Sequence, residues 1–180
     1  MLEYVEIEDS GVYVSALKFP RIPENWSELL ASWKEDCAEV WIQIVDAEAI
    51  AGLHHILFLI SNAISAFRFG YNKLKHLEAE LLLLLSGTDR FGRAVEMVGA
   101  KAGRPGIAIV VARERSACAC SIERIAASVD GADVLSPSTR EGALRVAIAQ
   151  GLSVTELRSM GDDIQAILCS LVERGALIYC

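Results

Sequence analysis

Two pairs of titratable residues have types that suit acid–base or metal chemistry. Glu78 and Glu80 lie within "LEAELLLLL", and His54 and His55 are adjacent within "GLHHILFLI". Both segments have helical patterns, and neighbouring residues on a helix point about 100° apart. The two glutamates therefore face different directions and do not form a convergent acid–base pair. The two histidines cannot bind one metal ion from the same helix, and no other histidine lies four residues from either.

The same positions have structural interpretations. Glu80 falls at the border of the apolar arc of its helix, where a carboxylate is usually paired. Its partner would be His76, four residues earlier, or a capping donor elsewhere. Glu78 falls inside the arc and needs a partner or a path to solvent, so its role stays open. We expect the histidines to be buried or to face a partner.

Motifs for other chemistry are not visible in the sequence. The five cysteines are an odd number without framework spacing, and Cys118-Ala-Cys120 is not a zinc-finger spacing. The loop "GAKAGRPG", residues 99–106, lacks the Lys-Ser/Thr of a phosphate-binding loop. We therefore expect a helper protein rather than an enzyme, with no catalytic residues, no cofactor and no metal.

Positive charge is concentrated in one part of an acidic chain. The formal net charge is −7, which argues against a general nucleic-acid-binding protein. Residues 68–115 nevertheless hold nine Lys or Arg and five Asp or Glu, a net of +4, while the remainder has a net of −11. Such a basic island is either a local footprint for an anionic partner or a chance cluster on solvated helix faces.

The elements that position these residues follow from hydrophobic periodicity. Two strands form an N-terminal hairpin that begins near Tyr4 and turns near Asp9–Gly11, and further strands are expected at 39–45 and 106–114. The last of these is apolar throughout, which predicts burial on both faces. Helices are expected at 25–36, 47–67, 74–86, 89–98, 121–129, 139–149 and 162–174.

Capping residues mark several helix ends. Asp46 is expected to cap the helix that starts at residue 47, and Thr88 the helix that starts at residue 89. Three glycines are expected to follow the ends of helices: Gly70, Gly87 and Gly99. Helix 74–86 is apolar nearly all round, which predicts a buried helix that forms a central helical hairpin with helix 47–67.

The order of elements predicts an α+β fold. The first two strands are a local hairpin and no β-α-β unit recurs, so we expect a small, mostly antiparallel sheet of about four strands. A helical layer that contains the central hairpin would pack with it. At 180 residues, we expect one domain over residues 1–180. The leucine run is too short to span a membrane and no signal peptide is visible, so we expect a cytoplasmic location and no membrane contact.

A series of short motifs along the middle of the chain resembles one known family. The motifs are Ile44, Val45 and Asp46; Asn62, Ala63, Ala66, Phe67 and Gly70; Lys73, Lys75, Leu77 and Glu80; and Ser86, Gly87, Phe91, Ala94 and Gly99. In this order and spacing, residues 45–114 resemble the small accessory subunit of the KEOPS complex, the TPRKB-like family. The segment "DIQAILCSLVERGAL" is similar to the last helix of that family, whereas residues 116–160 depart from it.

The resemblance implies a non-catalytic role in tRNA modification. KEOPS installs the threonylcarbamoyl group on the adenosine beside the anticodon of ANN-decoding tRNAs, and another subunit performs the chemistry. The accessory subunit binds and stimulates a kinase-like ATPase subunit, and in archaea it also contacts the 3′ CCA end of tRNA. The implied partners are therefore the kinase-like subunit, tRNA and, indirectly, the threonylcarbamoyl-transferase subunit.

The resemblance gives a meaning to two groups of residues. Six cations of the basic island would bind tRNA: Lys73, Lys75, Arg90, Arg93, Lys101 and Arg104. Exposed Phe69, Tyr71 or Phe91 would line a pocket for unstacked bases of the 3′ end. Asn62, Glu80 and Gly99 would belong to a structural motif.

The last helix has two interpretations. Its apolar stripe would face the kinase-like subunit: Ile164, Ile167, Leu168, Leu171 and Val172. Alternatively, the stripe packs on the core and leaves Cys169, Val172 and Leu177 for a partner. A second class of function also stays open, a small-ligand or anion-binding regulatory domain with the loop 99–106 as its anion site.

Overall fold

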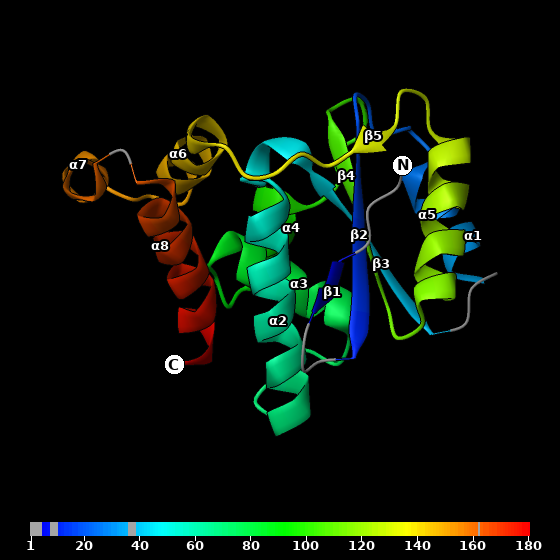
Figure 1. Ribbon diagram of the computed structural model, residues 1–180, viewed down its shortest axis with the longest axis horizontal. Helices are drawn as coiled ribbons and strands as arrows, with labels where there is room; N and C mark the ends of the chain where they lie inside the picture. Colours follow the sequence, from blue (N-terminus) through cyan, green and yellow to red (C-terminus); the bar gives the residue numbers. More distant parts are fainter. Residues whose placement is uncertain (1–4, 8–10, 36–38, 162) are drawn as a thin grey trace. The chain divides into compact units, whose positions relative to one another are not determined.

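The computed structural model describes residues 5–7, 11–35, 39–161 and 163–180. The chain forms two compact units, each from two separate segments: residues 1–47 with 99–135, and residues 48–98 with 136–180. We call them the first and the second unit, and Figure 1 shows the elements of each. Parts of the sequence predictions lie outside the described residues: Tyr4, the hairpin turn around Asp9, Cys37 and the expected helix start at Asp162.

The first unit contains an antiparallel sheet. β1 (Val5–Ile7), β2 (Val12–Phe19), β4 (Gly106–Ala112) and β3 (Val40–Asp46) pair in this order, and β5 (Asp133–Val134) pairs with the far end of β2. β4 is buried along its whole length, as its continuous apolar run predicts. The predicted α+β class and mostly antiparallel sheet are confirmed, with β5 as a short strand that the sequence pattern did not indicate.

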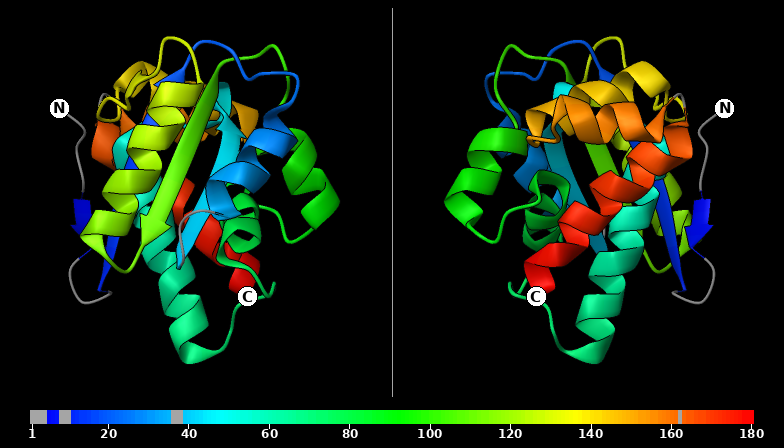
Figure 2. Two further views of the ribbon diagram at one scale, coloured as in Figure 1. Left: turned by 90° about the vertical axis from the view of Figure 1, so that its right-hand side faces the viewer. Right: turned by 90° about the vertical axis from the view of Figure 1, so that its left-hand side faces the viewer.

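Two helices pack on this sheet. α1 (Trp26–Glu35) and α5 (Arg115–Ser128) lie over the same face of it (Figure 2, left). The core between them includes Ile42, Val110 and Ile122. α5 begins at Arg115 rather than near residue 121. The sequence prediction missed its first turns because they are rich in alanine and cysteine and show no large apolar stripe.

The second unit is helical. α2 (Leu53–Phe69) packs on α3 (Leu77–Ser86), the expected hairpin, and α4 (Phe91–Val98) packs on α3. α6 (Arg140–Ala149), α7 (Val154–Met160), α8 (Ile164–Ala176) and a 3₁₀ turn, η2 (Leu177–Tyr179), complete it. The whole leucine run 81–85 is buried, so its interpretation as a buried helix is confirmed. Among the helices described, none is both long and apolar enough to cross a membrane.

The start of α2 corrects one prediction. Asp46 does not cap this helix, because a 3₁₀ turn, η1 (Ala47–Ala49), follows β3 and α2 begins only after Gly52. Gly52 has a φ of 108°, and a Cβ atom there would lie 2.5 Å from the Cα atom of Ser138. Only glycine permits this backbone and this close contact. Periodicity could not reveal the break, since the residues on both sides of it are apolar.

Two further helix starts differ from the predictions. α3 begins at Leu77 rather than Leu74, and α4 at Phe91 rather than Asp89. The Thr88 hydroxyl accepts the N–H of Arg90 at 3.3 Å, so it stabilises the turn before α4 and is not the N-cap. The glycine predictions fare better, because Gly70 and Gly87 end α2 and α3 in the left-handed conformation.

α7 is a helix that the sequence predictions missed. Ser153 and Glu156 form a capping box, in which each side chain accepts the backbone N–H of the other residue, at 3.2 and 2.7 Å. The pattern Ser-x-x-Glu is a recognisable helix start. It lay in the segment where the family resemblance is weakest.

Close helix packing fixes α8 in the second unit. α8 contacts α2, α3 and α6 (Figure 2, right). At Gly175, a Cβ atom would lie 2.7 Å from the carbonyl oxygen of Leu84 and 2.8 Å from Cδ2 of Leu59. α8 therefore approaches the backbone of α3 at a distance that only glycine allows.

Two helical glycines of the second unit give a matched test of this packing. Gly175→Ala should destabilise the protein by about 1 to 3 kcal/mol, because the added methyl group meets backbone that cannot move aside. Gly92→Ala in α4 should stabilise it by up to about 1 kcal/mol, since nothing lies within 4 Å of the position. Urea denaturation measures both free energies of unfolding. Equal effects of the two substitutions would contradict this account of the α8 contact.

Candidate functional site

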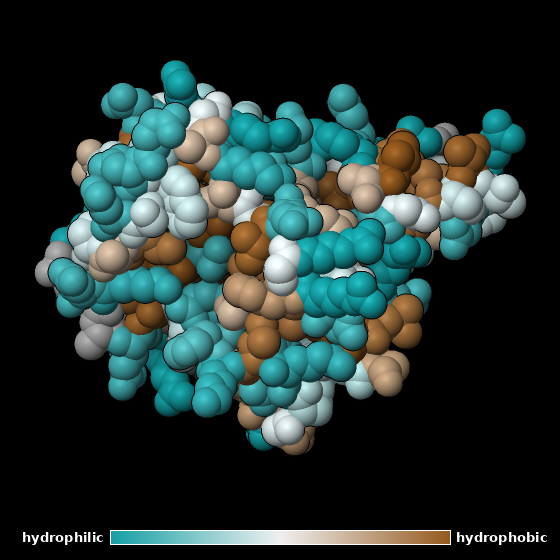
Figure 3. All heavy atoms as spheres, turned by 180° about the vertical axis from the view of Figure 1, so that it is seen from behind, coloured by the Kyte–Doolittle hydropathy of each residue, from teal (hydrophilic) through white to brown (hydrophobic). Residues whose placement is uncertain are grey.

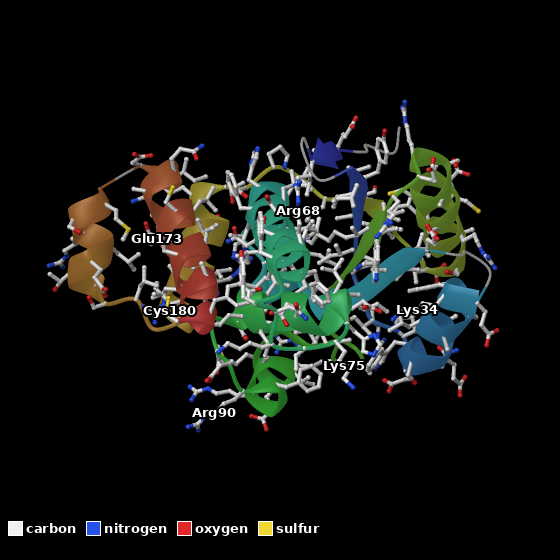
Figure 4. The ribbon with its side chains drawn as sticks, turned by 90° about the horizontal axis from the view of Figure 1, so that it is seen from below. Lys34, Arg68, Lys75, Arg90, Glu173 and Cys180 are labelled. Atoms are coloured by element: carbon white, nitrogen blue, oxygen red, sulfur yellow. The ribbon has the colours of Figure 1, made fainter. Side chains whose placement is uncertain are left out.

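Four of the six predicted tRNA-binding cations are exposed in the second unit. Lys73 and Lys75 lie on the loop between α2 and α3, residues 70–76, which we call the basic loop. Arg90 immediately precedes α4 and Arg93 lies within it. Figure 4 shows Lys75 and Arg90 pointing outward, away from the ribbon, along the same edge of this unit. The structure thus places these cations where a polyanion can reach them.

The other two predicted cations lie in the first unit and have a carboxylate partner. Arg104 Nε is 3.0 Å and Lys101 Nζ is 3.6 Å from Oδ2 of Asp46, whose side chain is buried. Asp46 closes β3, and the two cations come from the glycine-containing loop that leads into β4. The carboxylate offsets part of their charge, so they offer less attraction to phosphate than a count of residues suggests.

A fully buried carboxylate shapes the basic loop. Glu80 is 0 % exposed and accepts the backbone N–H groups of Lys73 at 3.1 Å and Leu74 at 2.8 Å. These bonds fold residues 73 and 74 back over the first turn of α3, which explains why the helix begins later than predicted. The partners of the Glu80 carboxylate are thus backbone N–H groups of the basic loop, and not the His76 side chain or a distant capping donor. These hydrogen bonds leave the side chains of Lys73 and Lys75 exposed.

A hollow of about 340 Å³ opens beside the basic loop. It is lined by Lys73, Gly87, Thr88, Asp89, Arg174, Leu177, Ile178 and Cys180. Two cations, one carboxylate and two apolar side chains therefore meet between the basic loop, the α3–α4 connection and the turn η2. Another hollow, of about 320 Å³, lies between α1 and α5 in the first unit, and no predicted site residue lines it.

Exposed aromatic groups accompany these cations. Phe69 is 71 % exposed, and Tyr71 and Phe91 are exposed by nearly half. The Arg68 guanidinium lies 5.8 Å from the centre of the Phe69 ring. Tyr71 makes an edge-to-face contact with Tyr179 of η2, with ring centres 4.9 Å apart. Aromatic faces beside cations suit the binding of nucleic-acid bases, which stack on such rings.

The apolar stripe of the last helix divides into a buried and an exposed part. Ile167, Leu168 and Leu171 are buried in a cluster with residues of α6, while Ile164 and Val172 are half-buried. Cys169 is exposed, and Leu177 of η2 is 63 % exposed. Figure 3 shows apolar surface near the end of the chain and over α6 and α7. The surface of α8 that a partner can reach is thus its outer flank.

The remaining predicted residues have ordinary structural surroundings. Asn62 is half-buried on α2. Gly99 is buried and forms an isolated antiparallel bridge with Val45, without the left-handed conformation of a helix-ending glycine. Arg174 and Tyr179 were missed by sequence reasoning, since only the packing of α8 brings them beside the basic loop.

The adjacent histidines hold backbone segments rather than a metal ion. Ser138 N–H donates to Nδ1 of the exposed His54, and Ala51 N–H donates to Nδ1 of the buried His55. Burial lowers the pKa of His55 from 6.5 to about 4. The ring is therefore neutral at pH 7, with its proton on Nε2. Within the described part of the chain, no group of three or more His, Cys, Asp or Glu is placed to bind a metal ion.

Comparison with known proteins identifies the family of this chain. A family model described as kinase binding protein CGI-121 matches residues 22–149, well over half of the chain. None of the curated proteins matches the chain. The matched residues include the basic loop, α3 and α4.

The buried His55 predicts a specific pH dependence of stability. Between pH 4 and 6.5, His55 is protonated in the unfolded chain but stays neutral in the folded protein. The free energy of unfolding should therefore fall as pH falls through this range. The total loss should be roughly 3 kcal/mol. His55→Gln should remove this part of the pH profile, and His54→Gln, its exposed neighbour, should not. A wild-type profile in His55→Gln, measured by urea denaturation from pH 4 to 7.5, would refute the assignment.

Proposed function

We propose, from the premise that this chain belongs to the CGI-121 family of kinase binding proteins, that it is the non-catalytic accessory subunit of a KEOPS complex. In this role it binds and stimulates the kinase-like ATPase subunit and helps to recruit tRNA by its 3′ CCA end. It acts on the threonylcarbamoyl-transferase subunit only indirectly. Family membership is the observation that carries the proposal.

The exposed cations support the tRNA part of the proposal. Lys73, Lys75, Arg90 and Arg93 belong to one unit of a chain whose net charge is otherwise negative. Each phosphate that they neutralise releases condensed counterions, which makes the affinity depend on salt. Lys101 and Arg104 contribute less in this proposal, because Asp46 already pairs with them.

The hollow beside the basic loop supports the choice of a single-stranded end. Single-stranded nucleotides are recognised by stacking of bases and by cations on the backbone. The hollow offers Lys73 and Arg174 for phosphate, with the Asp89 carboxylate also on its wall. Phe69 and Tyr71 would stack bases that approach along the loop.

The outer flank of α8 supports the protein-binding part. Ile167, Leu168 and Leu171 hold the helix on its own unit, so they would set the position of the flank rather than touch a partner. Cys169, Val172 and Leu177 would make the contact. Burial of one exposed leucine contributes about 1.5 to 3 kcal/mol, so Leu177 alone can change affinity more than tenfold.

The alternative function, an anion-binding regulatory domain built on the loop 99–106, has less support. The two cations of that loop pair with Asp46. Its backbone N–H groups at Gly103 and Arg104 bind the carbonyl groups of Ile22 and Lys101. A rise in melting temperature with inorganic phosphate alone would favour this alternative.

The kinase-like subunit provides the first test. Calorimetry should detect binding of the cognate kinase-like subunit at micromolar concentration or tighter, and Leu177→Asp and Cys169→Asp should each weaken it at least tenfold. Val154→Asp is a matched control, since Val154 is also 63 % exposed and lies on α7. Absence of binding by the wild-type protein would end the proposal. An equal loss of affinity in Val154→Asp would show that the outer flank of α8 is not the interface.

A charge reversal tests the tRNA surface. Lys73→Glu combined with Arg93→Glu should weaken tRNA binding. The negative slope of log association constant against log salt concentration should also become less steep, by about one to two. Arg21→Glu combined with Arg113→Glu is the control, because it changes the net charge equally at exposed positions of the first unit. Filter binding at several salt concentrations measures both. Wild-type affinity and slope in the first variant would exclude this surface.

A further inference from the structure

Glu80 contacts more than the basic loop. Its carboxylate accepts the N–H groups of Lys73 and Leu74, and the side-chain amide of Asn72 donates to the carbonyl of Leu74 at 2.8 Å. The loop is thus fixed at three consecutive residues. A buried carboxylate is costly unless it is hydrogen-bonded, so these bonds are hard to give up.

The turn η2 reaches the same carboxylate through Tyr179. The Tyr179 ring packs edge-to-face on Tyr71 of the basic loop, with an interplanar angle of 79°. Burial first, and then the Glu80 carboxylate, raise the pKa of the Tyr179 hydroxyl. The hydroxyl is buried, and Glu80 acts on it both as a hydrogen-bond acceptor and as a negative charge.

The hollow beside the basic loop is lined by residues of both the basic loop and η2. Lys73 of the basic loop and Leu177 and Ile178 of η2 line it together. A ligand in the hollow would therefore touch both the proposed tRNA-binding loop and the end of the proposed protein-binding flank. Either segment can move only if the shared contacts around Glu80 and Tyr179 adjust.

We infer that Glu80 and Tyr179 are positioning residues that couple the basic loop to η2, so that an anion bound at Lys73 and a protein bound at Leu177 alter each other's affinity. The inference rests on the proposed function, since it takes tRNA and the kinase-like subunit as the two ligands. The coupling is reciprocal, because the factor by which one ligand changes the affinity for the other is the same in both directions.

Two binding measurements test the coupling. In the wild-type protein, saturating kinase-like subunit should change the Kd of an ANN-decoding tRNA transcript at least threefold. Tyr179→Phe keeps the ring on Tyr71 but removes the hydroxyl, and it should bring this factor below about 1.5. Tyr13→Phe, at a half-buried tyrosine of β2 in the first unit, should keep the wild-type factor. Independent binding of the two ligands by the wild-type protein would overturn the inference and leave the proposed function intact.

Hydrogen exchange tests the inference without either ligand. Glu80→Gln should raise the exchange rates of the Lys73 and Leu74 amides at least tenfold, and Tyr179→Phe should raise them at least threefold. Tyr13→Phe should leave them unchanged. Wild-type exchange at both amides in Tyr179→Phe would overturn the coupling. If the wild-type protein binds neither ligand, the proposed function fails and the exchange rates alone decide whether the contact exists.

Discussion

The buried carboxylate of Glu80 is the interaction on which the candidate site depends. A charged group without water is stable only where hydrogen bonds replace its hydration. Here the replacement comes from two backbone N–H groups of the loop that precedes α3. The same bonds bend the loop and leave its two lysines exposed. One carboxylate thus determines where a helix starts and where its neighbouring cations lie.

The predicted cations have different surroundings in the two units. Asp46 draws Lys101 and Arg104 into ion pairs in the first unit, while Glu80 takes backbone donors and leaves Lys73 and Lys75 exposed in the second. In a count of charges along the sequence the four cations look equivalent. The difference lies in the donor that each carboxylate meets, which is a property of the folded chain.

Local patterns predicted much of the fold, and tertiary contacts account for what they missed. The leucine run and the apolar strand at 106–112 are buried because their composition leaves no alternative, and Gly70 and Gly87 end helices because glycine adopts the left-handed conformation easily. The late start of α2 depends on the contact of Gly52 with Ser138, far away in the sequence. The pairing of Tyr71 with Tyr179 likewise requires α8 to pack on α3. Such contacts leave no periodic trace in a single sequence.

Exposed large apolar side chains are concentrated in the second unit. Among the described residues, the large apolar side chains that are exposed all belong to it: Phe58, Phe69, Tyr71, Phe91, Val95, Ile148, Val154 and Leu177. In the first unit, large side chains such as Phe19, Ile42 and Ile122 are buried in the sheet core, and the loop cations pair with Asp46. Burial of exposed aromatic side chains against a partner is favourable because it removes a large apolar area from water. The exposed apolar groups that a partner could bury thus lie on the helices and loops of the second unit.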